Sequence, residues 1–323
     1  MRCLFVMDPA ETMLPDKDTS FAFMRGALAR GHECLHCLPK DVGIEPSGSG
    51  SPGVVAFART IVVNDAPPHV TLGQVRRICT EDIAVVFVRK DPPFDSAYLH
   101  LTQILDLVSE RLLVVNFPRG LMAANEKLFA LRFQQHIPRT CISSNREELF
   151  QFLSDLGGEG VLKPLDGAGG FGVVHLNVGD RNARALVDLI TLEGQRPALL
   201  QAFLPEVTAG DKRVLLVDGE ILGAIRRVPR KGDIRANIHV GGTVEPTDLT
   251  AEELALVIEV GGSLQKEGLW FTGLDLIGAN LIEINVTSPT GIQQLSRHLG
   301  RPVEQAVLAW AESRVREGRT QPT

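Results

Sequence analysis

Apolar runs alternate with amphipathic segments along the first 120 residues of the chain. The runs at 4–7, 84–88 and 112–115 contain no polar residue, which is typical of parallel strands buried on both faces. Residues 21–30 and 99–109 carry the spacing of helices. Strands that alternate with helices in this way predict an open α/β sheet.

The pattern changes after about residue 125, where short strands are separated by glycine turns. Residues 125–136, 147–156 and 251–267 predict helices. Asp218 and Gly219 stand between two apolar runs and are a strong signal for a two-residue β-hairpin. Further strands are predicted at 160–164, 173–178, 199–203, 214–217 and 221–224.

A glycine-rich loop at 167–172 matches the pattern G-x-G-x-x-G. That pattern indicates a dinucleotide site only where a helix follows, and residues 173–176 are β-rich, so a nicotinamide oxidoreductase is disfavoured. Glycines in a strand–loop–strand let backbone N–H groups approach phosphate oxygens, and Lys163 on the first strand could add a point charge. The alternative is a mobile surface turn beside an exposed lysine. The phosphate interpretation concerns Lys163, Gly167, Gly169 and Gly170.

Residues 273–286 read as a β-hairpin with polar residues on one face. Glu283 and Asn285 are two apart and share a face, and a three-residue turn at 278–280 would place Asp275 directly opposite Glu283. Opposed carboxylates repel, and a bound Mg²⁺ with its preference for oxygen ligands would remove that cost. The other face would then carry Leu274, Leu276, Ile282 and Ile284.

Two alternatives to this metal site stay open. The three polar residues could be the solvated face of an amphipathic hairpin. A two-residue turn at 279–280 would also change the register and place Asp275 on the opposite face.

Length and composition narrow the class of protein. At about 100–200 residues per domain, 323 residues predict two or three domains. Hydrophobic residues make up 44% and charged residues 22%, with a net charge of −6, so the basic excess of nucleic-acid binders is missing. Because no segment approaches the roughly 18 apolar residues of a membrane span, and residues 1–8 read as a strand rather than a signal peptide, we expect a cytoplasmic protein with no membrane or nucleic-acid partner.

The five cysteines are scattered and do not predict a disulfide framework, which fits a reducing cytoplasm. Four potential zinc ligands lie close together at His32, Cys34, His36 and Cys37. One Cys-x-x-Cys without a distant second pair is a weak zinc signal, and these residues fall where the second strand of the α/β sheet is expected. We therefore favour structural packing over a zinc site.

Seven short strings of the sequence stand out together: Val6–Pro9, Arg89–Asp95, Asn125–Phe129, Leu162–Gly167, Gly210–Val214, Gly273–Asp275 and Glu283–Thr290. They resemble strings of bacterial glutathione synthetases, which belong to the ATP-grasp superfamily, and they occur in the family's order over nearly the whole chain. The strings at 89–95 and 283–290 are specific to this family, whereas the lysine and glycine-loop strings alone would indicate only an ATP-grasp protein.

The resemblance implies an α/β protein with an ATP-grasp fold and an N-terminal open α/β (pre-ATP-grasp) domain. The implied divisions are an N-terminal domain at 1–124, a central lid subdomain at 125–204 and a C-terminal catalytic subdomain at 205–323. The implied reaction joins γ-L-glutamyl-L-cysteine to glycine through an acyl phosphate, with ATP and Mg²⁺ (or Mn²⁺ as a substitute), in a homo-oligomer, by resemblance a tetramer. The alternatives are an ATP-grasp ligase for another carboxylate–amine pair and a non-catalytic ATP-binding module of the same fold.

The resemblance also implies residue roles. The ATP side would comprise Lys127, Lys163, Gly167, Gly169, Gly170, the hinge Gln201, Ala202, Phe203 and Leu204, and Asp211. Mg²⁺ would be held by Asp275, Glu283 and Asn285. Arg213 would face the transferred phosphate, while Arg89, Arg227 and Arg235 would line the peptide and acyl-phosphate side, the last two also serving catalysis.

Two segments and one residue depart from the simple pattern. Phe203 stands in the hinge where the resemblance leads us to expect a tyrosine, and the loop 47–53 looks like a local insertion. Residues 228–242 have no sustained apolar period, carry Arg230, Lys231 and Arg235, and end in two glycines. Because long loops of this kind are often active-site lids, we expect this segment to close over the reaction intermediate.

Overall fold

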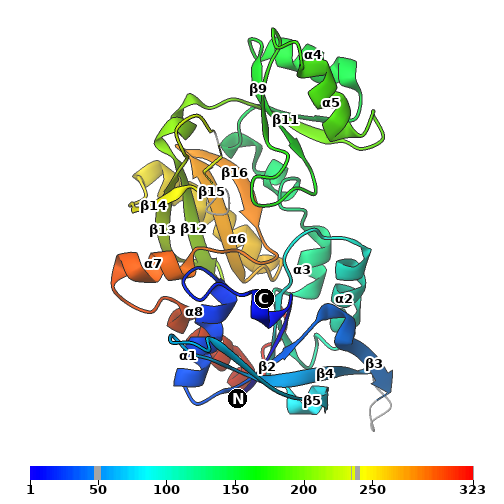
Figure 1. Cartoon of the computed structure of the whole chain (residues 1–323), viewed down its shortest axis with the longest axis vertical. Coiled ribbons are helices and arrows are strands. Elements are labelled where there is room, and N and C mark those ends of the chain that lie inside the picture. The colour runs from blue at the N-terminus through cyan, green and yellow to red at the C-terminus, as the bar shows by residue number, and fades with distance from the viewer. Residues whose placement is uncertain (47–51, 234, 237–240, 323) are drawn as a thin grey trace.

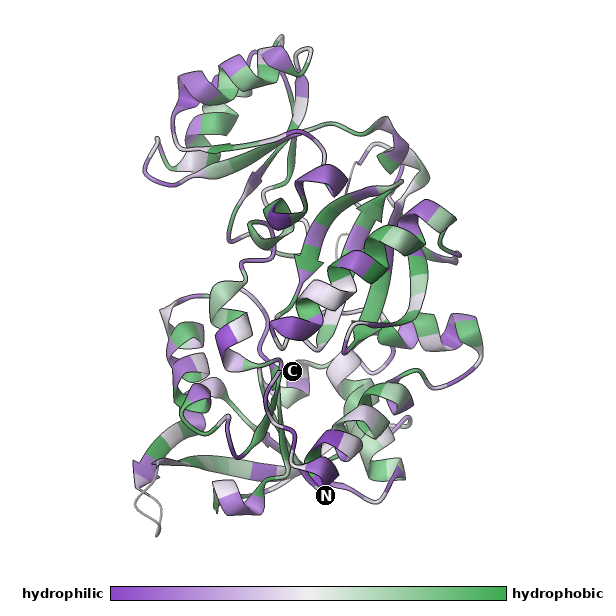
Figure 2. Cartoon of the chain, turned by 180° about the vertical axis from the view of Figure 1, so that it is seen from behind, coloured by the Kyte–Doolittle hydropathy of each residue, from purple (hydrophilic) through white to green (hydrophobic). Residues whose placement is uncertain are grey.

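Three β-sheets follow one another along the long axis of the molecule (Figure 1). The computed structural model describes residues 1–46, 52–233, 235–236 and 241–322. Within these ranges, no helix is long and apolar enough to cross a membrane. Figure 2 shows that the strands are largely hydrophobic, whereas the helices beside them mix hydrophobic and hydrophilic residues.

The first sheet has seven strands in the order β3-β4-β2-β1-β6-β7, with β5 paired to β4. Strands β1, β2, β6 and β7 run parallel, which confirms the open α/β sheet predicted from the alternating pattern. The strands are β1 (Arg2–Met7), β2 (Glu33–Cys37), β3 (Val42–Pro46), β4 (Pro52–Val63), β5 (Val70–Cys79), β6 (Val85–Arg89) and β7 (Leu113–Val115). The helices are α1 (Thr19–Ala29), α2 (Ser96–Asp106) and α3 (Pro118–Ala123).

Local sequence explains where the two long helices of this part begin. Asp18 caps α1 by accepting a hydrogen bond from the Ser20 N–H at 2.7 Å, and Asp95 caps α2 by accepting from the Tyr98 N–H at 2.9 Å. The β3–β4 hairpin brackets the predicted insertion at 47–53, of which residues 47–51 lie outside the described residues.

The second sheet is antiparallel, in the order β10-β9-β11-β8, and has a hydrophobic core of its own. Leu149 and Leu153 of one helix and Val187 of the other pack on Leu162 and Leu200 of the sheet. The elements are β8 (Thr140–Ser143), α4 (Arg146–Asp155), β9 (Glu159–Pro164), β10 (Val174–Asn177), α5 (Ala183–Thr191) and β11 (Ala198–Ala202).

The third sheet is also antiparallel, in the order β14-β13-β12-β15-β16. The predicted hairpin at Asp218 and Gly219 is confirmed, with φ of 50° and 81° at the two residues, as a two-residue turn of this kind requires. The elements are β12 (Asp211–Val217), β13 (Glu220–Val228), β14 (Thr243–Pro246), α6 (Ala251–Lys266), β15 (Phe271–Ile277), β16 (Asn280–Asn285), α7 (Ile292–Leu299) and α8 (Glu304–Glu317).

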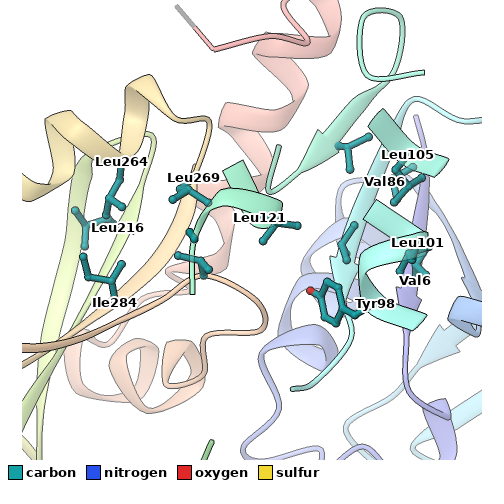
Figure 3. Packing of buried hydrophobic residues seen from close by; sticks show 14 of the residues in the cluster. Val6, Val86, Tyr98, Leu101, Leu105, Leu121, Leu216, Leu264, Leu269 and Ile284 are labelled. Carbon is teal, nitrogen blue, oxygen red and sulfur yellow. The ribbon is translucent and has the colours of Figure 1, made fainter. Parts of the chain in front are cut away.

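One hydrophobic cluster joins the first and third sheets. Figure 3 shows Leu121 of α3 between Tyr98 and Leu101 of α2 on one side and Leu216 and Ile284 of the third sheet on the other. At the chain's end, α8 returns to pack against α1. These contacts fix the two sheets relative to each other, and therefore fix the walls of any cavity between them.

The helix predicted at 125–136 is wrong in its start and its type. A 3₁₀ helix runs from Phe129 to His136 and is interrupted at Phe133 by non-helical dihedrals. Before it, the Asn125 side chain accepts hydrogen bonds from the N–H groups of Lys127 and Leu128, both at 3.0 Å. An asparagine that bonds to nearby backbone N–H groups forms a turn instead of a helix, and this turn directs Lys127 towards the third sheet.

The possible zinc ligands of the second strand do not converge. Cys34 and Cys37 are buried in different hydrophobic clusters, on opposite faces of the sheet. The His36 ring bonds to the Asp8 carbonyl at 3.1 Å, and His32 lies between the Met1 amino group and Glu312. These residues therefore have structural roles in packing and hydrogen bonding, as we favoured over a zinc site.

Candidate active site

A cavity lies between the second and third sheets. It brings together every residue predicted for the ATP side, although these come from five separate stretches of the chain. Arg235, predicted for the peptide side, also lines this cavity. The predicted residues on its wall are Lys127, Lys163, Gly167, Gly169, Gly170, Gln201, Ala202, Phe203, Leu204, Asp211, Arg235, Asp275 and Glu283.

Lys163 points into this cavity from β9 and is 9% exposed. Its Nζ donates to the Gln201 side chain on the adjacent strand β11 at 2.9 Å. Burial lowers the pKa of Lys163 to about 8. A buried amine held by a neutral amide is poised to gain an anionic partner, because phosphate oxygens would restore the interactions it loses by leaving water.

Lys127 reaches the same cavity from the turn after Asn125. Its Nζ forms an ion pair with Glu283 at 3.0 Å and also contacts the Gly167 carbonyl. This lysine therefore connects the hairpin of the third sheet with the glycine loop of the second.

The glycine loop is shaped by close backbone contacts. A Cβ on Gly167 would lie 2.7 Å from the Pro164 ring and 2.8 Å from the Phe171 carbonyl, so a side chain has no room there. Gly170 has a φ of 82°, in the left-handed region that favours glycine. The loop thus exposes backbone atoms rather than side chains to the cavity.

The hinge segment at 201–204 comprises the last two residues of β11 and the two residues that follow it. The Phe203 ring packs against the His175 ring with centroids 4.4 Å apart, and Val161 and Val173 line the same cavity as Phe203. An apolar slot beside exposed backbone groups suits a purine base, and it does not need the tyrosine hydroxyl that the resemblance led us to expect.

The hairpin places its acidic residues on one face as predicted, although its turn differs from the one we predicted. Asp275 pairs directly with Glu283, and Gly273 with Asn285, so all three polar side chains share a face. The turn, however, comprises the two residues 278–279, and a register shift after Asp275 takes up the extra residue. Our assignment of Ile282 to the apolar face is therefore wrong: Ile282 lines the cavity, and Leu281 is fully buried in its place.

Two arginines bind Asp275. Arg213 donates to both of its carboxylate oxygens, at 2.5 and 2.9 Å, and Arg227 donates to one at 3.0 Å. Arg227 also binds both oxygens of Asp211, at 2.7 and 2.6 Å. Although Asp275 is only 4% exposed and burial opposes its charge, the two arginines hold its pKa well below the usual range.

A second cavity lies between the first and third sheets. Arg89, Arg213, Arg227 and Asn285 line it, as does the glycine loop through Gly169. Gly169 lines the first cavity as well, so the two cavities meet at this loop. Of the residues predicted for the peptide side, Arg89 and Arg227 are found here. The predicted lid is described only in part, since residues 234 and 237–240 lie outside the described residues, and it stays a prediction.

Glu126 was not singled out by the sequence. One of its carboxylate oxygens accepts hydrogen bonds from the Val286 N–H at 2.9 Å, the Thr287 N–H at 3.1 Å and the Thr287 hydroxyl at 2.8 Å. Its pKa is raised by burial and by Glu283. Glu126 ties the turn that carries Lys127 to the end of β16, and its place inside the matched string at 125–129 was the signal that could have identified it.

The overall arrangement is the ATP-grasp fold. Solved structures with the same fold include the RimK-domain ATP-grasp protein of Sphaerobacter thermophilus, with a TM-score of 0.63, 18% identity, and coverage of 96% of this chain and 99% of that one. The macrocyclase MdnC of Microcystis aeruginosa, bound to its precursor peptide, gives a TM-score of 0.65 at 17% identity, covering 97% of this chain and all of the other (100%).

Sequence comparison then specifies the family. Residues 1–122 match the N-terminal domain of prokaryotic glutathione synthetase, and residues 126–300 match its ATP-grasp domain. The glutathione synthetase of Synechococcus elongatus is 41% identical over 98% of this chain and 100% of its own, and that of Bradyrhizobium diazoefficiens is 40% identical over 94% and 95%. The chain belongs to the prokaryotic glutathione synthetase family.

Proposed function

We propose that this chain joins the cysteinyl carboxylate of γ-L-glutamyl-L-cysteine to the amine of glycine and releases glutathione, ADP and phosphate. Membership of the family supports the reaction. The observation that carries the proposal is the meeting of the two cavities at the glycine loop. Arg213 and Arg227 line the second cavity and bind Asp275 and Asp211, which line the first. A nucleotide in the first cavity and a carboxylate in the second would face each other at the glycine loop.

The chemistry follows from the poor reactivity of a free carboxylate. A cysteinyl carboxylate oxygen bonds to the γ-phosphorus of ATP as the bond to the β-phosphate oxygen breaks, giving an acyl phosphate and ADP. The glycine amine then attacks the acyl carbon, loses a proton, and phosphate leaves. This chemistry needs positioning and charge stabilisation more than a protein nucleophile.

The basic residues divide this work between the two cavities. Lys127 and Lys163 hold the phosphates from either side of the glycine loop, and the hinge at 201–204 offers backbone groups to the adenine. Arg213 and Arg227 place fixed positive charge next to the phosphoryl group during its transfer. The same charge stabilises the oxyanion that forms when glycine attacks the acyl phosphate. Arg235, which is held by Asp233 at 2.8 Å, would contribute from the nucleotide side.

The oxygen donors of the hairpin fit Mg²⁺. Asp275, Glu283 and Asn285 present two carboxylates and an amide on one face, and hard oxygen ligands are those that Mg²⁺ prefers. When bound, Mg²⁺ offsets charge on the phosphates. Lys127 pairs with Glu283, and the two arginines pair with Asp275, which offsets the repulsion between the two carboxylates.

Three further features are proposed on the basis of family resemblance. They are the division into a domain at 1–124 and ATP-grasp subdomains at 125–204 and 205–323, a homo-oligomeric, tetrameric state, and a cytoplasmic location. Each of the three sheets falls within one of these divisions, which supports the first. Light scattering of the purified protein tests the second: a monomeric mass would contradict it.

The reaction is tested by supplying γ-glutamylcysteine, ATP and Mg²⁺ with a panel of amino acids. We expect ADP, phosphate and glutathione only when glycine is present. Product with a different amino acid and none with glycine would assign the chain to another carboxylate–amine ligase. ADP release that is independent of the dipeptide would contradict ligation altogether.

A further inference from the structure

We propose that Asp18 and Arg89 recognise the amino-acid head group of the glutamyl residue, Asp18 binding its α-ammonium and Arg89 its α-carboxylate. Both residues line the second cavity. The inference rests on the proposed function, because it assumes that the dipeptide occupies this cavity. It specifies which end of the dipeptide lies where, and which residues distinguish it from other thiol-bearing carboxylates.

Arg89 is a buried cation without a carboxylate partner among the described residues. It is 5% exposed, and its guanidinium lies over the rings of Phe23 and Phe271 at 5.8 and 5.7 Å. Its Nε donates to the Ser20 hydroxyl and its Nη2 to the Pro289 carbonyl, both at 3.1 Å. The remaining nitrogen, Nη1, donates to no group in the described part of the chain, and burial lowers the pKa of the side chain. A carboxylate from the cavity would complete this site.

Asp18 supplies the opposite charge on the same cavity. Its carboxylate caps α1 by accepting from the Ser20 N–H at 2.7 Å and from the Phe21 N–H, and it forms no ion pair with a lysine or arginine among the described residues. Burial raises its pKa, with Arg89 as a partly compensating charge nearby. A buried carboxylate with a raised pKa favours a cationic ligand, because an ammonium would replace the hydration that the carboxylate loses on burial.

Gln294 provides an independent sign that a donor binds here. Its Oε1 is buried and has no hydrogen-bond partner among the described residues, and the side chain, 8% exposed, lines the same cavity. The preceding residue, Gln293, donates to the Asp18 carbonyl at 2.7 Å, so α7 starts beside Asp18. An ammonium has three N–H groups, and this wall offers it the Gln294 Oε1, which has no donor, and the Asp18 carboxylate, which has no ion-pair partner among the described residues.

The γ-linkage explains why one head group can use both charges. In γ-glutamylcysteine the glutamyl α-ammonium and α-carboxylate are both free, and they lie at the end of the molecule opposite the reacting cysteinyl carboxylate. In the cavity, Asp18 and Arg89 belong to the first sheet's side, whereas Asn285 and the glycine loop belong to the nucleotide side. The two ends of the substrate thus match the two ends of the cavity.

Glycine is also a zwitterion, but it fits this pair poorly for a chemical reason. Its nitrogen must lose a proton to attack the acyl phosphate, and a carboxylate that binds its ammonium would raise the pKa of that nitrogen. The glutamyl nitrogen does not react, so it stays an ammonium throughout the reaction.

The test compares γ-glutamylcysteine with glutarylcysteine, which lacks only the α-amino group. In the unaltered enzyme, kcat/KM should be about ten- to a hundredfold lower for glutarylcysteine, the usual range for one charged hydrogen bond. Asp18→Asn should remove this preference: its kcat/KM should fall by a similar factor with γ-glutamylcysteine and stay unchanged with glutarylcysteine. Asparagine caps helices as well as aspartate, so α1 should remain intact, which thermal melting verifies.

The carboxylate half is tested with γ-aminobutyrylcysteine, which keeps an amine but lacks the α-carboxylate. Arg89→Lys, which loses the forked geometry, should reduce kcat/KM for γ-glutamylcysteine more than for this analogue. Asp16→Asn is the matched control, because Asp16 is two residues away and lines a different surface pocket, and it should leave both preferences unchanged.

Several outcomes would overturn the proposal. An equal loss with both substrates in Asp18→Asn would mean that Asp18 only supports the helix. A raised KM for glycine with an unchanged preference between the dipeptides would mean that the pair binds the acceptor. If no glutathione forms with the unaltered enzyme, the proposed function itself fails, and this result is distinct from the other two.

Discussion

Asp275 and Glu283 are both proposed as metal ligands but have different partners in the fold, and the variants Asp275→Asn and Glu283→Gln separate the two roles. Each substitution removes one negative charge and almost no volume. Both should lower turnover by roughly a hundredfold or more, because each removes charge that positions the phosphates and the metal. The structure predicts very different costs in stability.

The magnitudes follow from the contacts. Asp275 is 4% exposed and receives Arg213 at 2.5 and 2.9 Å and Arg227 at 3.0 Å. Removing its charge leaves two buried arginines to share Asp211, and breaking such a pair costs about 3–5 kcal/mol. Glu283 has a side chain 20% exposed and an ion pair to Lys127 at 3.0 Å; removing its charge leaves the buried Lys127 with the Gly167 carbonyl, at a cost of about 1–3 kcal/mol. The difference is therefore about 2 kcal/mol.

Thermal and guanidinium unfolding of both variants, without ATP or Mg²⁺, measures this difference. We expect Asp275→Asn to melt several degrees below Glu283→Gln at neutral pH. Because the pKa of Asp275 is depressed in the folded state, its contribution is complete above the unfolded value of about 4 and is lost as the pH falls below it, so the gap should narrow in acid. Equal melting temperatures at pH 7 would refute the arginine network as a source of stability. Near-normal Mg²⁺ dependence in both variants would refute the metal assignment.

Three further substitutions test single contacts. Lys163→Met should raise the Kd for ATP about ten- to a hundredfold in calorimetry. In the unaltered enzyme this Kd should also rise as the pH increases through about 8, because the amine of Lys163 loses its charge there. The variant should lack this pH dependence. Glu126→Ala should lower the free energy of unfolding by about 1–3 kcal/mol and raise the KM for the dipeptide, while Glu126→Gln, which keeps an acceptor for Val286 and Thr287, should lose far less. Gly167→Ala should weaken ATP binding with little change in melting temperature, because its Cβ would lie 2.7 Å from Pro164 and distort a loop outside the cores; unchanged ATP affinity would show that the loop shape is unimportant.

The sequence predicted those features that depend on local periodicity or on a specific string. The parallel strands β1, β6 and β7 appear as uninterrupted apolar runs because helices cover both faces of the sheet. Asp218 and Gly219 require positive φ at both positions, and few residue pairs other than this one favour it. These signals involve neighbouring residues only, so a single sequence is enough to read them.

Features that depend on pairing between distant strands were not predictable in the same way. The register of Asp275 with Glu283 was predicted from a turn of the wrong length, because a β-bulge has no clear sequence signal. The binding of Arg227 to Asp211 and Asp275 requires β13, β12 and β15 to lie side by side, which no local pattern specifies. Asp18 reads from the sequence only as a helix cap, because its position on the cavity depends on α1 and α7 packing together.

The most direct test of the central claim is the mass of the product formed from γ-glutamylcysteine, isotopically labelled glycine, ATP and Mg²⁺. We predict labelled glutathione in equal amount to the ADP released, and no ADP above background when the dipeptide is left out. ADP release without a labelled product, or a labelled product only when another amino acid replaces glycine, would contradict the assignment of this chain as a ligase of γ-glutamylcysteine and glycine.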